Sequence, residues 1–175
     1  MTEAQLSNAM DAYGSTVYRL ALTRMQNIAD AEDVYQEVFF RLWKQAAEDW
    51  DGDRAKAWLI RTTLNRCADL HRFHLRRPVL SFAEIPDLAQ PEDESRELWE
   101  AVSRLPEKAR TAVHLYYAEG YSAEEISQLM HIPAATVRTR LHRARKQLKE
   151  LLGGIDDETC VSRSDGTNFG PQRAE

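Results

Sequence analysis

The chain has 175 residues, of which 43% are apolar and 29% charged, the composition of a globular protein. No apolar stretch is long enough to span a bilayer. Residues 1–10 lack the basic start and apolar core of a secretory signal. We therefore expect a cytoplasmic protein whose two cysteines, Cys67 and Cys160, are thiols.

The net charge of −5 argues against a polyanion as a partner, but the charge is segregated along the chain. Residues 59–77 sum to +4 and residues 134–150 to +5, whereas residues 84–100 between them sum to −6. Two basic segments separated by an acidic one predict two surfaces that bind a polyanion.

Apolar residues recur at three- and four-residue steps and no segment alternates convincingly with period two, so the predicted fold is all-α. We expect two small helical modules, residues 8–77 and 98–152, joined by a flexible, proline-punctuated acidic linker at 78–97 and followed by a disordered tail at 153–175. The first module holds a helix around residues 10–21, one from Asp30 that this residue caps, and one over about 55–77. The second holds helices at 98–104, 106–118, 123–130 and 134–152.

Residues 120–152 carry the pattern of a helix-turn-helix. Gly120 suits a left-handed residue that ends the preceding helix. Ser122 and Glu125 form an S-x-x-E capping box that opens the next one. A three-residue turn ending at Pro133 then separates that short helix from a long basic one. This order predicts a helix-turn-helix whose second helix enters the major groove of DNA.

The polar face of that second helix combines groups that read bases with groups that hold phosphates. Arg pairs with guanine through two hydrogen bonds and the Thr methyl group contacts thymine, while Lys and Arg further along neutralise phosphates. A solvated basic helix in a bundle is the alternative, and the capping box and turn weigh against it. The predicted duplex-contacting residues are Ala135, Thr136, Arg138, Thr139, His142, Arg143 and Lys146.

The helix expected over residues 55–77 has a polar face of different chemistry. Arg and aromatic planes stack on unpaired bases, and Asn and Asp bond to base edges, so this face suits single-stranded nucleic acid. A solvated face with ion pairs from Asp69 to Arg61 or Arg72 is the alternative. The predicted strand-contacting residues are Trp58, Arg61, Asn65, Asp69, Arg72 and Arg76, with Phe73 beside them.

Cys67, His71 and His74 fall on one face of the same helix at a spacing that could present ligands to zinc. The sequence offers no evident fourth ligand, and this face is also the one expected to pack against neighbouring helices. We therefore expect packing there, and no metal or other cofactor.

The acidic helix that starts at Asp30 has an unusual aromatic residue. Its expected buried half includes Val34, Tyr35, Val38, Phe39, Leu42 and Trp43, whereas Phe40 lies on the opposite face among charged residues. An exposed aromatic ring surrounded by charges is a common pattern at protein contacts, although a lone exposed Phe is also normal on monomers.

Three strings of this sequence, in this order, resemble the extracytoplasmic-function (ECF) group of RNA polymerase sigma factors. They are DAEDVYQEVFFRLW, WLIRTTLNRCADLHR and LPEKARTAVHLYYAEGYSAEEISQLMHIPAATVRTRLHRARKQL, and the resemblance covers about residues 8–152. It implies sigma region 2 at residues 8–77 and sigma region 4, a helix-turn-helix of the winged-helix-like DNA-binding class, at residues 98–152. Tyr35 departs from the family pattern, which often has a small or aliphatic residue there.

The resemblance also implies a function and its partners. A sigma factor is not an enzyme: it binds core RNA polymerase and directs it to promoter DNA, and this group usually has an anti-sigma partner. The first string would dock on a coiled coil of the largest catalytic subunit. The second would hold the melted promoter element, with a base-capturing loop at residues 49–54, and the third would read the upstream duplex element. The linker would thread toward the RNA exit path. The polymerase-contacting residues so implied are Asp33, Gln36, Glu37, Phe40 and Arg41.

Other functions fit parts of the sequence. A stand-alone repressor or activator would use the N-terminal module to dimerise or sense a signal, and would bind a palindrome without polymerase. An enzyme is disfavoured because the chain has no phosphate-loop, H-E-x-x-H or G-x-S-x-G motif. A purely protein-binding adaptor would not need the basic recognition helix.

Overall fold

The computed structural model describes residues 2–45, 52–76 and 93–153, which form helices and turns with no β-strand among them. The all-α prediction is confirmed. The predicted linker, the start of the base-capturing loop, Cys160 and the predicted tail lie largely or wholly outside the described residues. The helices are α1 (Glu3–Met25), α2 (Ile28–Lys44), α3 (Gly52–Arg76), α4 (Asp93–Ser103), α5 (Glu107–Val113), the π-helical turn η1 (His114–Ala118), α6 (Ala123–Met130) and α7 (Ala134–Leu151).

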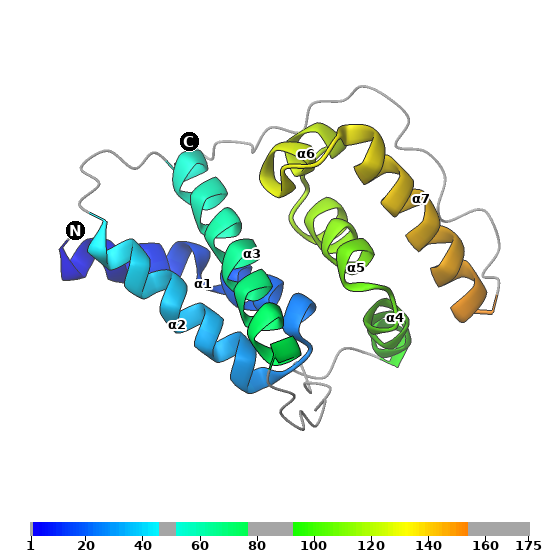
Figure 1. Cartoon of the computed structure of the whole chain (residues 1–175), viewed down its shortest axis with the longest axis horizontal. Coiled ribbons are helices and arrows are strands. Elements are labelled where there is room, and N and C mark those ends of the chain that lie inside the picture. Colours follow the sequence, from blue (N-terminus) through cyan, green and yellow to red (C-terminus); the bar gives the residue numbers. More distant parts are fainter. Residues whose placement is uncertain (1, 46–51, 77–92, 154–175) are drawn as a thin grey trace.

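These helices form two groups that lie side by side, α1–α3 and α4–α7 (Figure 1). We call them the first and second modules. Within the described residues, none of the helices is both long and apolar enough to cross a membrane.

The start of α2 differs from the sequence expectation. Its N-cap is Asn27, whose side-chain oxygen accepts a hydrogen bond from the backbone N–H of Asp30 at 2.9 Å. The helix therefore begins at Ile28, and Asp30 lies inside the first turn, where its carboxylate faces the positive end of the helix dipole.

The core of the first module is built from fully buried side chains of all three helices, including Val17, Val38 and Leu59. Trp43, expected on the buried half of its helix, is instead 52% exposed, and Leu75 of α3 is 83% exposed. Both lie near the ends of their helices, beyond the reach of the neighbouring helices that cover the middle turns.

Tyr35, the departure from the family pattern, is accommodated by a glycine on the facing helix. A Cβ atom at Gly14 of α1 would lie 3.0 Å from the Tyr35 hydroxyl oxygen, so the missing side chain leaves room for the ring. The ring also packs 4.8 Å from that of Phe39 and edge-on to that of Tyr18 at 6.3 Å, measured between centroids.

The second module contains the expected helix-turn-helix and one interruption. The helix expected over residues 106–118 becomes π-helical after Val113. Gly120 has a φ of 76°, and Ser122 and Glu125 form the expected capping box, so both predictions are confirmed. Ile126, Val137 and Leu141 are buried and join α6 to α7, whereas Leu151 at the end of α7 is exposed.

The two modules pack against each other through one continuous apolar cluster. Leu20 of α1 and Ile60 and Leu64 of α3 share this cluster with Leu105, Leu115 and other residues of the second module. Figure 1 shows α3 facing the second module and α7 at its far side. The apolar half of α3 is broad because it contacts both modules.

Candidate nucleic-acid interface

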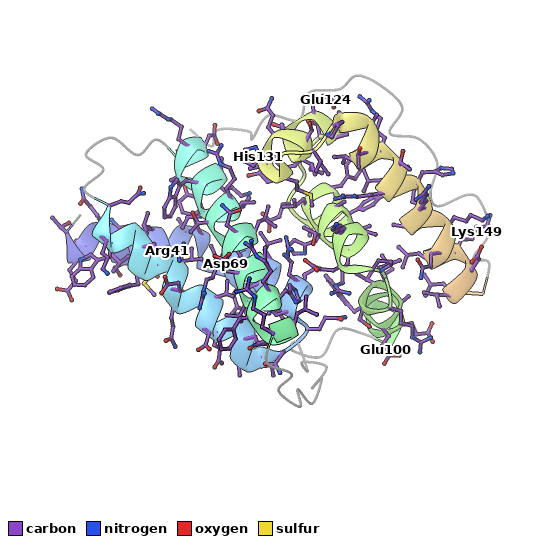
Figure 2. All side chains as sticks on the ribbon, viewed as in Figure 1. Arg41, Asp69, Glu100, Glu124, His131 and Lys149 are labelled. Carbon is purple, nitrogen blue, oxygen red and sulfur yellow. The ribbon has the colours of Figure 1, made fainter. Side chains whose placement is uncertain are left out.

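The polar face of α7 is open to solvent. Among the residues predicted to contact duplex DNA, Thr136 is half-buried and the others are exposed: Ala135, Arg138, Thr139, His142, Arg143 and Lys146. Figure 2 shows Lys149 near the end of this helix, on the outer side of the molecule. Packing against the module therefore leaves the whole basic face of α7 available to a large partner.

Arg138 is held by a residue that sequence reasoning did not single out. Its guanidinium forms an ion pair with the carboxylate of Glu124 on α6, and both side chains are exposed. The pair joins the two helices of the helix-turn-helix on the same side as the predicted base-reading residues. Glu124 is therefore a neighbour of the Arg138 guanidinium in the absence of DNA.

A second contact ties α7 to the π-helical turn. Nε of Arg145 donates a hydrogen bond to the Tyr117 hydroxyl at 2.7 Å, and the guanidinium lies 5.8 Å and 5.9 Å from the ring centroids of Tyr116 and Tyr117. Single π-helical turns are frequent at functional sites. Here the turn carries the Tyr116 and Tyr117 rings, which contact Arg145 of α7. The sequence predicted a regular helix at this place and did not indicate the contact.

The polar face of α3 is also exposed, at Arg61, Asn65, Asp69, Arg72 and Arg76. Arg72 donates to the Asp69 carboxylate at 2.6 Å, which is one of the two ion pairs considered from the sequence. Trp58 differs from the rest because its ring is half-buried against the first-module core, so only part of it faces solvent.

The polar faces of α2 and α3 meet in two adjoining hollows. One, of about 440 Å³, is lined by residues implied to contact polymerase, and the other, of about 700 Å³, by residues predicted to contact the melted strand. Asp33 and Arg66 line both. Figure 2 shows Arg41 of α2 and Asp69 of α3 on this part of the molecule. Arg66, which sequence reasoning left out, thus links the two candidate surfaces.

The exposed face of α2 carries an ion pair within the helix and the exposed Phe40 ring. Nε of Arg41 donates to the Glu37 carboxylate at 2.7 Å, and this bond holds the pKa of that carboxyl below its usual value. The Lys44 ammonium lies 4.0 Å from the centroid of the Phe40 ring, which is 45% exposed. Asp33 and Gln36 are exposed beside it.

The possible zinc ligands of α3 do not converge. Cys67 is fully buried, and burial raises the pKa of its thiol to about 12. Nε2 of His71 lies 3.7 Å from Glu107, and Nε2 of His74 lies 3.6 Å from Asp30. In the described part of the chain no three such residues are grouped to hold a metal.

Comparison with known proteins assigns both modules. The Sigma-70 region 2 family matches residues 9–77, and the Sigma-70 region 4 family matches residues 95–148. The ECF RNA polymerase sigma factor SigM of Bacillus subtilis is 32% identical over 155 residues, covering 83% of this chain and 94% of SigM. The chain is an ECF sigma factor of the sigma-70 family.

Further relatives of this sigma factor include longer proteins. The ECF sigma factor SigE of Mycolicibacterium smegmatis is 34% identical over 86% of this chain, which spans 62% of SigE. The probable sigma factor RfaY of Xanthomonas campestris is 32% identical over 81% of this chain, which spans 39% of RfaY.

Two solved structures share the fold. RpoE of Bartonella quintana, solved with the anti-sigma factor NepR, superimposes with a TM-score of 0.73 over 87% of this chain and 99% of that one, at 23% identity. CnrH, solved with the cytosolic domain of CnrY, gives a TM-score of 0.62 at 25% identity and covers 89% of this chain and 92% of that one.

Proposed function

We propose that this sigma factor binds core RNA polymerase and directs it to promoters, reading an upstream duplex element with α7 and holding the melted element with α3. The observation that carries the proposal is that two exposed basic faces lie on helices of different modules of a sigma-70 family chain. Each face has the side chains that its form of DNA requires, and neither is covered by the packing of the modules.

Duplex reading is assigned to the first turns of α7. Arg138 is exposed beside Glu124, and the fork of donors on its guanidinium matches O6 and N7 of guanine. Arg143 and Lys146 lie further along the same face, where they would neutralise phosphates and fix the register of the helix without reading sequence.

Strand holding is assigned to the polar face of α3. Extruding a base from the duplex costs a few kcal/mol, and stacking on aromatic or Arg planes returns roughly 1–3 kcal/mol per base. Arg61 and Arg76 offer exposed planes, Asn65 offers an amide for base edges, and Phe73 offers an exposed ring. These groups are of the right kind and number to offset the opening of a short segment.

Polymerase binding is assigned to the exposed face of α2, at Asp33, Gln36, Glu37, Phe40 and Arg41. An exposed ring beside charged groups has the composition of an interface hot spot. The protein is then a non-enzymatic factor that works in the cytoplasm with polymerase, and an anti-sigma factor would control it, as NepR accompanies RpoE.

Run-off transcription with core polymerase on candidate promoters, with and without the protein, tests the function. We expect specific transcripts only when the protein is present. A stand-alone repressor would instead bind a palindromic site without polymerase and would add no transcript.

The polymerase surface is tested by a pull-down with core enzyme. Phe40→Ala should weaken binding while the far-ultraviolet circular dichroism and melting temperature stay unchanged. Met10→Ala is the matched control, because Met10 is an exposed apolar side chain of the same module on α1. Equal retention of both variants would place the polymerase contact elsewhere.

A further inference from the structure

One flank of α7 carries two exposed arginines that contact neighbouring elements. Arg138 and Arg145 are seven residues apart, so they lie two turns apart on the same side of the helix. Arg138 pairs with Glu124 of α6, and Arg145 contacts Tyr117 of η1. The proposed function gives Arg138 a role at the bases but gives none to Arg145 or Tyr117, although both are exposed beside the proposed reading face.

The Arg145 guanidinium makes three contacts with the π-helical turn. Its Nε donates a hydrogen bond to the Tyr117 hydroxyl at 2.7 Å, and its carbon lies 5.8 Å from the centroid of the Tyr116 ring and 5.9 Å from that of Tyr117. The two rings pack edge to face with their centroids 4.9 Å apart. Tyr116 in turn packs against the buried apolar cluster. The guanidinium is thus linked to the core through two aromatic rings.

These contacts use only one of the hydrogen-bond donors of the guanidinium. Arginine has five N–H donors in a planar fork, and the Tyr117 hydroxyl accepts from the one on Nε. In the part of the chain that the structure describes, no residue accepts a hydrogen bond from Nη1 or Nη2 of Arg145. The Nη donors are therefore available to an external group, and their planar arrangement matches two oxygens of a phosphate.

The place of Arg145 along α7 suits a contact with the DNA backbone. The first turns of a recognition helix contact base edges in the major groove, which is about 8.5 Å deep. Arg145 follows Arg138 by about 10.5 Å along the helix axis. Because a helix that rises out of the groove carries its later turns outward, Arg145 would meet phosphates while Arg138 meets bases.

Stability of the fold gives little reason for this arrangement. Arg145 is exposed and the Tyr117 side chain is 58% exposed, and solvated contacts of this kind contribute little to the free energy of folding. On a surface that binds a polyanion the same contacts have a use. A cation that is ordered before binding loses less conformational entropy when it binds.

We propose that Tyr117 and Arg145 form a phosphate clamp, in which Tyr117 positions the Arg145 guanidinium and the guanidinium binds one backbone phosphate of the upstream duplex element. The inference rests on the proposed function, because it requires that the first turns of α7 enter the major groove. The clamp carries no sequence information, so it adds the same affinity to every duplex that α7 binds.

The test measures how the affinity for duplex DNA depends on salt. The full chain in complex with core polymerase is titrated with a short duplex carrying the upstream element, by fluorescence anisotropy over a range of salt concentrations. Arg145→Ala should weaken binding about tenfold. It should also make the slope of log affinity against log salt shallower by about 0.9, because one phosphate fewer is neutralised. Arg145→Gln should change the slope equally, and it provides the measurement if circular dichroism shows that Arg145→Ala is unfolded.

The positioning role of Tyr117 is tested in the same assay. Tyr117→Phe keeps both rings and the charge of Arg145 but removes the hydroxyl that accepts from Nε. We expect binding to weaken about threefold with an unchanged slope, because the number of neutralised phosphates stays the same. In the Arg145→Ala background, Tyr117→Phe should have no further effect.

Two variants are matched controls. Lys108→Ala removes an exposed cation from α5 of the same module. Tyr13→Phe removes a tyrosine hydroxyl that donates to the Gly52 carbonyl at 3.1 Å in the first module. Neither should change the affinity for the upstream duplex or its salt dependence.

An unchanged slope in Arg145→Ala and Arg145→Gln would overturn the phosphate contact, whatever happens to the affinity. Equal weakening by Tyr117→Phe with and without Arg145 would overturn the positioning role of Tyr117. A wild-type complex that binds the upstream element no better than an unrelated duplex would instead refute the proposed function, and this result is seen before any residue is substituted.

Discussion

The two basic helices, α3 and α7, have the same composition bias but different positions in the protein. α7 buries one stripe, including Val137 and Leu141, within its own module. α3 buries two, because Leu59 and Cys67 pack into the first module whereas Ile60 and Leu64 pack against the second. A helix with one buried stripe can move with its module, whereas α3 makes the joint between modules.

Their polar faces differ in a corresponding way. On α7, Arg138 and Arg145 are held by Glu124 and Tyr117, which belong to other elements. On α3, Arg72 is held by Asp69 of the same helix. Side chains that contact residues of another helix or turn suit duplex DNA, because the positions of the bases in a duplex are fixed before binding. Side chains fixed only by their own helix suit extruded bases, whose positions are less constrained.

The largest expected effect is on the free energy of unfolding, and it tests whether α3 packs against both modules. Ile60 and Leu59 are both buried, but their partners lie in different modules. Leu59→Ala and Ile60→Ala should each lower the free energy of unfolding by about 2–5 kcal/mol, measured by urea denaturation. A loss for Leu59→Ala with none for Ile60→Ala would show that the second module does not cover Ile60 in solution.

A smaller effect separates base reading from phosphate binding on α7. Arg138→Ala should reduce discrimination among duplex sequences by roughly 1–3 kcal/mol, measured as binding profiles of the polymerase complex across variant upstream elements. Lys146→Ala should weaken binding to all of them alike and lower the salt dependence by about one ion. Identical profiles for wild type and Arg138→Ala would remove the reading role from this residue.

Local signals predicted local structure well. Gly120, Ser122 and Glu125 determined the start of α6 through backbone conformation and capping, which involve near neighbours only. The face of the helix over residues 55–77 that carries Cys67 was expected to pack against neighbouring helices, and Cys67 is buried. The packing of Ile60 and Leu64 of the same helix against the second module was not predicted.

Features that depend on distant partners were not predicted. Arg110 looks like an ordinary charge on a helix, and only the folded chain brings it to carbonyls 87 and 86 residues away. Glu124 and Arg66 likewise gain their roles from side chains on other helices. Trp58 was expected on an open face, and its half-buried position follows from contact with the first-module core.

A still smaller effect tests the polar face of α3. Asn65→Ala removes one exposed amide, and the loss of its bond to a base edge should cost about 1 kcal/mol. We expect weaker capture of a premelted promoter by the polymerase complex, with binding to the upstream duplex unchanged. The matched control on α7 is Thr139→Ala, which should affect only the duplex. Equal effects of both variants on both substrates would contradict the division of labour between the helices.

The smallest expected effect compares a histidine at the module boundary with one on the DNA face. His114 is buried, and Nδ1 of its ring lies 3.2 Å from the Thr23 hydroxyl, with Glu119 at 3.8 Å from Nε2 and Arg19 of α1 also acting on its charge. Burial lowers the pKa of the imidazole from its usual value of 6.5. As the pH falls through 6.5, the unfolded chain therefore binds a proton at this imidazole, whereas the folded chain resists protonation there.

Stability should accordingly decline as the pH falls from above 6.5 to below it. His114→Gln keeps a side chain that can bond to Thr23 but cannot titrate, so its free energy of unfolding should vary less with pH than that of the wild type. His142→Gln, at an exposed position of α7, should follow the wild-type curve. Urea denaturation across this range makes the measurement. Parallel curves for wild type and His114→Gln would mean that the imidazole is hydrated in solution, and the modules would then be apart at the boundary between α1 and η1.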